Sequence, residues 1–153
     1  MSHPMIFAKT ASLFLLLLLC ISAPHARAQN QTPAKIASVS WTDPATGLTW
    51  TKQDNGSDVN WNQATAYCSN MRLGGYTDWR LPTIDELQDI YDANANVDGY
   101  HVKGNLQLSE YWQWSSSSGN ASGEAWRFTF SHGGRISGPL GFSGGKRALC
   151  VRR

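Results

Sequence analysis

The feature that most constrains the fold of this chain is a pair of cysteines, Cys68 and Cys150, that remain once an N-terminal export signal is removed. Residues 1–28 have the three parts of such a signal: a basic residue, an apolar run over 11–21, and a small-x-small cleavage site at 26–28. Exported proteins fold in an oxidising compartment, where the cysteines of a small domain commonly pair. We therefore expect a disulfide that closes a loop of about 80 residues and stabilises the fold by roughly 4 kcal/mol.

The apolar run near the N-terminus also bears on membrane attachment. It is about 11 residues long, whereas a membrane-spanning helix needs roughly 20, so we expect no membrane span. Cys20 lies within this run, where a lipoprotein signal would place the cysteine that receives a lipid. The preceding residues 17–19 are all leucine and lack the small side chains that a lipoprotein peptidase prefers. We therefore favour cleavage before Gln29 over lipidation of Cys20.

The charge of the chain is balanced overall but divided along the sequence. The 13 basic and 11 acidic residues include two basic residues in the expected signal, so the remaining chain is neutral. Residues 29–100 hold four basic and nine acidic side chains, and residues 101–153 hold seven basic and two acidic ones. This division either marks a surface for anionic ligands or lets the two halves face each other. We favour the second explanation and keep the first open.

The chain after residue 28 is long enough for one domain with one core. We divide it into a flexible polar tail over 29–38 and a domain over 39–153. All seven tryptophans lie in this domain, which has few long aliphatic runs. Such a core, built from large side chains that each carry one polar N–H, indicates a fold rich in loops.

Capping signals predict two helices. Asn60 is a good N-cap with Gln63 three residues later, and Thr83 stands in the same relation to Glu86. The first helix is expected to end at Gly74–Gly75. Apolar residues recur at helical spacing in each helix: Trp61, Ala64, Thr65, Cys68 and Met71 in the first, and Leu87, Ile90 and Tyr91 in the second.

Strand signals surround the two helices. A turn over 43–47 precedes a strand over 48–51, and residues 93–109 lack periodicity and are expected to form a long loop. Three more strands are expected over 111–116, 125–130 and 148–152, with a flexible glycine-rich segment over 131–146. This order predicts an α+β fold, with two helices packed on a small antiparallel sheet and long loops.

Several motifs resemble one bacterial family from about Trp41 to Arg152. The most specific is Asp-Trp-Arg-Leu-Pro-Thr at 78–83, accompanied by Asn-Trp-x-x-Ala-x-x-Tyr-Cys at 60–68, Trp-Ser-Ser at 114–116, Ala-Trp at 125–126 and Cys-Val-Arg at 150–152. This pattern resembles the C-terminal domain of the Legionella collagen-like adhesin, long catalogued as a domain of unknown function. The layout is also similar to the formylglycine-generating-enzyme superfamily.

The resemblance implies a C-type lectin-like fold, in which a cysteine of the first helix pairs with a cysteine of the last strand. Cys68 and Cys150 occupy those positions. We expect the regular positions of the motifs to be structural, holding the loop between the helices and the core rather than a ligand. These positions are Trp61, Trp79, Arg80, Pro82, Thr83, Glu86, Trp114 and Trp126.

The sequence does not favour an enzyme, and we expect no catalytic residue, cofactor or metal. Gly-Phe-Ser-Gly-Gly at 141–145 matches a nucleophile elbow, but no acid and no histidine follows it. Formylglycine-generating chemistry needs redox-active cysteines, and the expected disulfide uses both that remain. The cluster at 54–58 lacks the ligand pattern of a calcium loop, and residues 126–128 read Trp-Arg-Phe where sugar-binding lectins have Trp-Asn-Asp. His101 and His132 are isolated.

We therefore predict an exported binding or adhesion module, periplasmic or extracellular, with cell-surface association open. The expected ligand-binding residues lie on C-terminal loops: His132, Arg135, Phe142, Lys146 and Arg147. Arginine and lysine suit sulfate or carboxylate groups, and an exposed ring suits a sugar. The resemblance implies glycosaminoglycan binding, so the expected partner is an anionic polysaccharide or a protein, not nucleic acid. The alternative is a structural or assembly subunit of a periplasmic or surface complex, including a homo-oligomer.

Overall fold

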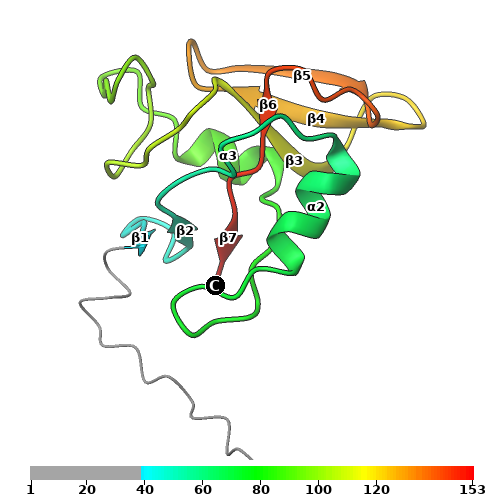
Figure 1. Cartoon of the computed structure of the whole chain (residues 1–153). Helices are drawn as coiled ribbons and strands as arrows, with labels where there is room; N and C mark the ends of the chain where they lie inside the picture. The colour runs from blue at the N-terminus through cyan, green and yellow to red at the C-terminus, as the bar shows by residue number, and fades with distance from the viewer. Residues whose placement is uncertain (1–38) are drawn as a thin grey trace, which may run out of the picture.

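The computed structural model describes residues 39–153 (Figure 1). The expected signal peptide over 1–28 with its Cys20, and the expected tail over 29–38, lie outside the described residues. The described chain has an α+β architecture, with two helices and two small sheets.

The chain begins with a hairpin of two short strands, β1 (Ser40–Thr42) and β2 (Thr49–Thr51). The predicted turn joins them, and Gly47 adopts a positive φ of 71° that other residues rarely adopt. The buried Asp43 holds this turn, because its carboxylate accepts hydrogen bonds from the backbone of Ala45 and the hydroxyl of Thr46. The hairpin brings Trp41 opposite Trp50, whose side chain is fully buried.

Helix α2 (Trp61–Ser69) begins as predicted, with a complete capping box between Asn60 and Gln63. It buries Ala64 and Cys68 on one face. Its predicted end at Gly74–Gly75 is wrong, because Asn70 caps the helix and its backbone N–H donates to the carbonyl of Ala66. The two glycines belong to a separate tight turn, in which both have positive φ.

Helix α3 (Ile84–Asp89) also begins as predicted, with a capping box between Thr83 and Glu86. The carboxylate of Glu86 accepts from the backbone N–H of Thr83 at 2.8 Å. The same carboxylate accepts two hydrogen bonds from the guanidinium of Arg80, at 2.7 and 2.6 Å. One side chain thus caps α3 and anchors the segment that enters it.

This shared carboxylate predicts sensitivity to acid. The hydrogen bonds from Arg80 lower the pKa of Glu86 below its ordinary value of 4.5, against the opposing effect of burial. A carboxyl whose folded pKa is lowered contributes stability above its unfolded pKa, and that stability is lost as the pH falls through the folded value. The melting temperature should therefore fall more between about pH 7 and pH 3 in the wild type than in Glu86→Gln.

Circular dichroism at the two pH values measures this difference. Asp89→Asn is the matched control, because Asp89 lies on the same helix with its carboxyl exposed and outside this network. The control should keep the full acid sensitivity of the wild type. An equal loss in the wild type and Glu86→Gln would contradict the role given to this pair.

The second sheet is mixed rather than purely antiparallel as predicted. Its strand order is β5-β4-β3-β6, and β6 runs parallel to β3. The three-stranded sheet has the order β1-β2-β7. The remaining strands are β3 (Trp112–Ser118), β4 (Glu124–Thr129), β5 (Gly134–Pro139), β6 (Lys146–Arg147) and β7 (Val151–Arg152).

The predicted flexible segment over 131–146 is also wrong in part, because it contains β5. This strand pairs with β4 along its whole length, from Glu124 opposite Pro139 to Thr129 opposite Gly134. Gly133, with a φ of 76°, makes the turn between the two strands. Hydrogen bonds to a neighbouring strand thus order a stretch whose glycines indicate flexibility when it is considered alone.

The final strand begins later than predicted, because side chains bind the backbone before it. The N–H of Ala148 donates to the side-chain oxygen of Asn55, and that of Cys150 donates to the hydroxyl of Thr51. The strand itself then comprises only Val151 and Arg152, which lie opposite Trp50 and Thr49 of β2. In Figure 1 the chain end lies beside β2 and β7, below the four-stranded sheet.

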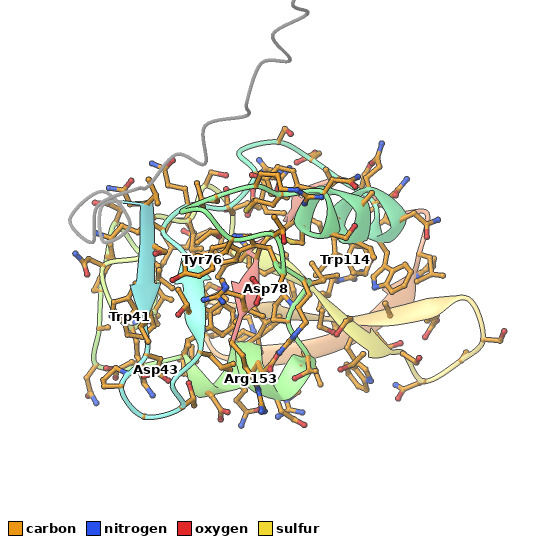
Figure 2. All side chains as sticks on the ribbon, turned by 90° about the horizontal axis from the view of Figure 1, so that it is seen from below. Trp41, Asp43, Tyr76, Asp78, Trp114 and Arg153 are labelled. Atoms are coloured by element: carbon orange, nitrogen blue, oxygen red, sulfur yellow. A yellow bond between two sulfur atoms is a disulfide. The ribbon has the colours of Figure 1, made fainter. Side chains whose placement is uncertain are left out.

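The predicted disulfide is confirmed: Cys68 of α2 is bonded to Cys150, directly before β7, with their Cα atoms 5.5 Å apart. Both cysteines are fully buried in a cluster that also contains Trp79 and Trp114. Figure 2 shows Trp114 beneath α2. A second, larger cluster includes Trp50, Leu87 and Phe128. The bridge therefore lies in the smaller of two adjoining parts of the core.

Candidate functional site

Strands β3 and β4 place three large side chains on one face of the four-stranded sheet. Trp114 lies opposite Arg127, and Trp112 lies two residues from Trp114, so all three point to the same face. The guanidinium carbon of Arg127 is 5.4 Å from the ring centre of Trp112 and 5.8 Å from that of Trp114. These distances are typical of cation–π contacts.

Two nitrogen atoms of Arg127, Nε and Nη1, are buried and have no hydrogen-bond partner within residues 39–153. No carboxylate of the described chain lies within ion-pair distance of this guanidinium either. Burial lowers the pKa of Arg127, against the opposing charge of Glu124, although arginine stays charged at neutral pH. The aromatic rings stabilise the charge but leave two donors without an acceptor.

Lys146 of β6 lies beside this guanidinium and is also buried. Its ammonium group donates to the carbonyl of Gly144 and lies 3.8 Å from the ring centre of Phe142. Burial lowers the pKa of Lys146, and the positive charge of Arg127 lowers it further, against Asp58 and Glu110. Two cations thus lie together with no paired carboxylate among the described residues.

Phe142 covers both cations from the loop that joins β5 to β6. Its ring centre is 6.0 Å from the guanidinium carbon of Arg127, and the residue is 53% exposed. Gly138 leaves room for the side chain of Arg127, since a Cβ atom at position 138 would lie only 2.7 Å from Nη1 of Arg127. We call Trp112, Trp114, Arg127, Phe142 and Lys146 the cationic–aromatic cluster.

The structure brings together only part of the predicted ligand-binding set. Phe142 and Lys146 belong to the cluster. Arg147 follows Lys146 in β6 but is engaged elsewhere, because it forms an ion pair with Asp58 and donates to the hydroxyl of Ser109 at 3.0 Å. Its positive charge is therefore largely neutralised locally.

The other two predicted residues lie apart from the cluster. Arg135 is part of β5 rather than a loop, pairs with Asp85 at 2.9 Å and donates to Gln88 of α3. It lies opposite Phe128 in the sheet and therefore faces away from Arg127. His132 is exposed in the turn before β5, with its Nδ1 atom 2.8 Å from the hydroxyl of Ser131.

Arg127 and Trp112 belong to the cluster but not to the ligand-binding set expected from the sequence. In the sequence, Arg127 stands where a calcium-binding lectin would have Asn, and nothing distinguishes Trp112 as a binding residue. Alternation along the strand at 124–129 places Arg127 and Ala125 on one face of the sheet. This alternation is the one feature of the local sequence that could identify Arg127 as facing the site. The approach of Phe142 and Lys146 depends on a parallel pairing that local sequence does not reveal.

The positions expected to be structural are tied to the framework. The indole N–H groups of Trp61, Trp79 and Trp114 donate to the backbone carbonyls of Ser115, Leu73 and Val59. Pro82 is buried, and its carbonyl accepts from the N–H of Ser116. Trp126 is half-buried against the larger core cluster. These contacts connect α2, the loop before α3 and the four-stranded sheet.

The cluster at 54–58 begins with the carboxylate of Asp54, which is engaged inside the fold. This buried carboxylate is occupied by hydrogen bonds from Gly56, Ser109 and Gln113. Within residues 39–153, no three His, Cys, Asp or Glu side chains gather in a way that could hold a metal ion. No helix in the same range is long and apolar enough to cross a membrane.

Comparison with known proteins places this domain in a family. No curated protein matches the sequence significantly. The family described as the Lcl C-terminal domain matches residues 40–152, which cover the whole described domain except its outermost residues. The matched range contains the motif at 78–83, both cysteines and the cationic–aromatic cluster. The chain therefore belongs to the Lcl C-terminal domain family.

Proposed function

We propose that this chain is an exported, non-catalytic adhesion module with a C-type lectin-like fold, and that it binds anionic saccharides at the cationic–aromatic cluster. The family supports an adhesin-like role. The disulfide between the first described helix and the C-terminal segment supports both the fold and export to an oxidising compartment. Periplasmic and extracellular locations both satisfy this proposal.

The observation that carries the proposal is the unpaired guanidinium of Arg127 beside Lys146. Leaving polar donors buried without acceptors costs free energy, and a sulfate or carboxylate oxygen would satisfy them. The free protein bears this free-energy cost, and a bound ligand removes it, so its removal contributes to the free energy of binding. Arg127 therefore differs from Arg135 and Arg147, which already have carboxylate partners.

Phe142 gives the proposed site its selectivity for saccharides over simple anions. Its exposed ring supplies an apolar face against which a sugar ring can pack, directly above the two cations. Because Nε and Nη1 of Arg127 are buried, a ligand reaches them only when the groups that cover them move aside. The ligand class that fits is a sugar ring bearing a sulfate or carboxylate group.

Chromatography on immobilised heparin with a salt gradient tests this proposal. Arg127→Gln and Lys146→Gln should each weaken binding about tenfold or more, because each removes a charge-assisted contact. Phe142→Ala should also elute earlier while leaving both cations in place. Arg135→Gln is the charge-matched control and should elute with the wild type, because Arg135 lies on the opposite face.

Thermal unfolding of each variant separates lost binding from lost folding, and Phe142→Ala removes an exposed ring whose loss leaves the core intact. A wild-type protein that passes through the column at low salt would refute the polyanion proposal. Equal effects of Arg135→Gln and Arg127→Gln would refute the assignment to the cluster.

A second candidate function is that of an assembly subunit, and one observation favours it. Strand β5 is an outer strand of the four-stranded sheet, and its Ile136 is 43% exposed. An outer strand with an exposed apolar residue can pair with a second chain. Native mass spectrometry of the exported chain distinguishes this role, since a subunit should occur as a stable oligomer without any saccharide.

A further inference from the structure

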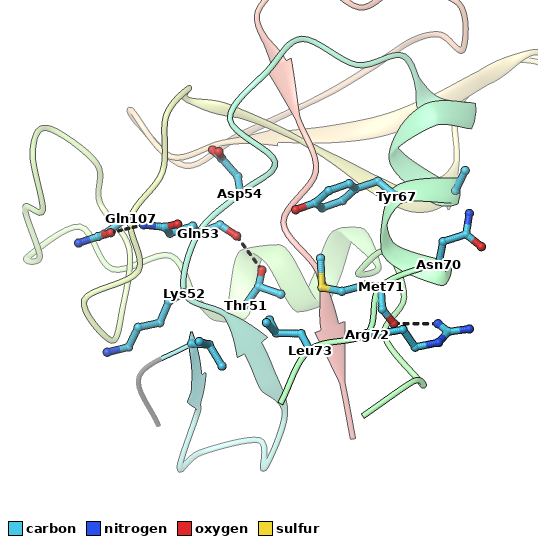
Figure 3. Close-up of a pocket in the computed structure, with 12 residues that line it drawn as sticks. Thr51, Lys52, Gln53, Asp54, Tyr67, Asn70, Met71, Arg72, Leu73 and Gln107 are labelled. Atoms are coloured by element: carbon cyan, nitrogen blue, oxygen red, sulfur yellow. Dashed lines mark hydrogen bonds between the residues drawn. The ribbon is translucent and has the colours of Figure 1, made fainter. Parts of the chain in front are cut away.

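A cavity lies away from the cationic–aromatic cluster and shares no residue with it. It is a cleft of about 830 Å³ between the chain that leaves β2, the C-terminal end of α2 and the long loop at Gln107 (Figure 3). Its volume falls within the range of about 300–1,000 Å³ that small-molecule sites commonly occupy. The lining residues that matter below are Thr51, Lys52, Gln53, Tyr67, Met71 and Gln107.

Neutral polar groups converge on this cleft. Figure 3 shows Tyr67 extending from α2 toward the wall formed by 51–54. Its hydroxyl has no hydrogen-bond partner within residues 39–153, and burial and the charge of Asp54 raise its pKa, so it stays protonated at neutral pH. On the opposite wall the amide of Gln53 donates to that of Gln107 at 2.7 Å. This pairing leaves the carboxamide oxygen of Gln53 and three N–H groups, one on Gln53 and two on Gln107, to bind a ligand.

The floor and the charge of the cleft limit the class of ligand. Met71 and Leu73 supply apolar surface, and Arg72 is engaged with backbone carbonyls. Asp54 has its carboxylate occupied by internal donors. Lys52 and Arg72 have no carboxylate partner among the described residues, and the negative charge of Asp54 offsets one of these two positive charges. Such a cleft suits a neutral ligand that carries many hydroxyl groups and one apolar face.

A peptide strand is a poorer fit, because the backbone bordering the cleft is already paired. The N–H of Thr51 donates to Cys150, the N–H of Lys52 donates to Val39, and the carbonyl of Lys52 accepts from Gln107. Among the described residues, the backbone of 51–52 therefore offers no free strand edge for strand addition. Side-chain amides and a phenol hydroxyl remain, and these both donate and accept, as sugar hydroxyls do.

We propose that this cleft binds a neutral saccharide, with an N-acetylhexosamine as the unit that uses both the amide wall and the apolar floor. This goes beyond the anionic site of the cationic–aromatic cluster and does not depend on it. The amides of Gln53 and Gln107 and the hydroxyl of Tyr67 bind the sugar hydroxyls and the acetamido group. The acetamido methyl packs on Met71 and Leu73.

The test is an NMR titration of the whole exported chain, labelled with ¹⁵N, with N,N′-diacetylchitobiose. Cellobiose, which has the same linkage without acetamido groups, is titrated in parallel. We expect the amide signals of 51–54, 66–73 and 107 to shift with the first sugar and to shift less with cellobiose. Tyr67→Phe and Gln107→Ala should each weaken binding about three- to tenfold, as expected for one neutral hydrogen bond.

Tyr111→Phe is the matched control, because Tyr111 is comparably exposed but outside the cleft, and it should bind like the wild type. Absence of shifts at the cleft with either sugar would overturn the proposal, as would shifts confined to Arg127 and Phe142. Shifts at the cleft with tetra-alanine but neither sugar would assign it to a protein segment and overturn it equally. Heparin elution of Tyr67→Phe should match the wild type, so failure here leaves the anionic site untouched.

Discussion

We expect that replacing Cys68 and Cys150 together by alanine lowers the free energy of unfolding by about 4–5 kcal/mol. The bridge joins residues 82 positions apart, so its loss releases a long loop in the unfolded chain. Both side chains are fully buried, and removing the sulfur atoms also loosens the cluster around Trp79 and Trp114. A domain of this size has a total stability of only about 5–15 kcal/mol, so the variant should be largely unfolded when warmed.

Urea unfolding followed by tryptophan fluorescence measures this loss. The wild type with reductant should approach the double variant, whereas reductant should leave the double variant itself unchanged. The comparison therefore separates the cross-link from nonspecific effects of the reductant. An unchanged urea midpoint in the double variant would contradict the structural role of the bridge.

The second large effect is expected at Asp54, where Asp54→Ala should cost about 3 kcal/mol of stability. Its buried carboxylate accepts hydrogen bonds from the N–H of Gly56, the N–H and hydroxyl of Ser109, and the amide of Gln113. These donors come from three separate segments, so the carboxylate holds the chain after β2 against the long loop and β3. Removing it takes an acceptor from the amide N–H of the fully buried Gln113, whose amide oxygen already has no partner among the described residues.

Asp89→Ala is the control for this prediction. Asp89 is exposed on α3, so its substitution should change stability by less than about 0.5 kcal/mol. Both variants are compared with the wild type by urea unfolding at neutral pH. A loss at Asp54 no larger than at Asp89 would show that its hydrogen bonds are replaceable by water.

The features that could be predicted from the sequence are those encoded within a few residues. Both capping boxes depend on residues three positions apart, Asn60 with Gln63 and Thr83 with Glu86, so both helix starts were predicted correctly. The turn at Gly47 is equally local. The disulfide was predictable for a different reason, because only two cysteines remain after the expected signal.

The features that were missed depend on pairing between distant segments. Glycines at 133, 134, 138 and 141 indicate a loop, but β4 supplies hydrogen bonds that order most of this stretch as β5. The parallel pairing of β6 with β3 joins Lys146 to Trp112, 34 positions earlier in the sequence, and no local pattern encodes it. The candidate site follows the same rule. Phe142 and Lys146 can be predicted as binding residues because one is aromatic and the other charged in a glycine-rich segment. Arg127 can be assigned to the site only once the register between β3 and β4 places it opposite Trp114.

The last eight residues of the chain connect both sheets. Lys146 and Arg147 complete the four-stranded sheet, Val151 and Arg152 complete the three-stranded one, and Cys150 between them closes the bridge to α2. Neither sheet is therefore complete on a nascent chain that ends before these residues. Stable folding of the domain has to wait until residues 146–152 are available to pair with β3 and β2 and to close the bridge.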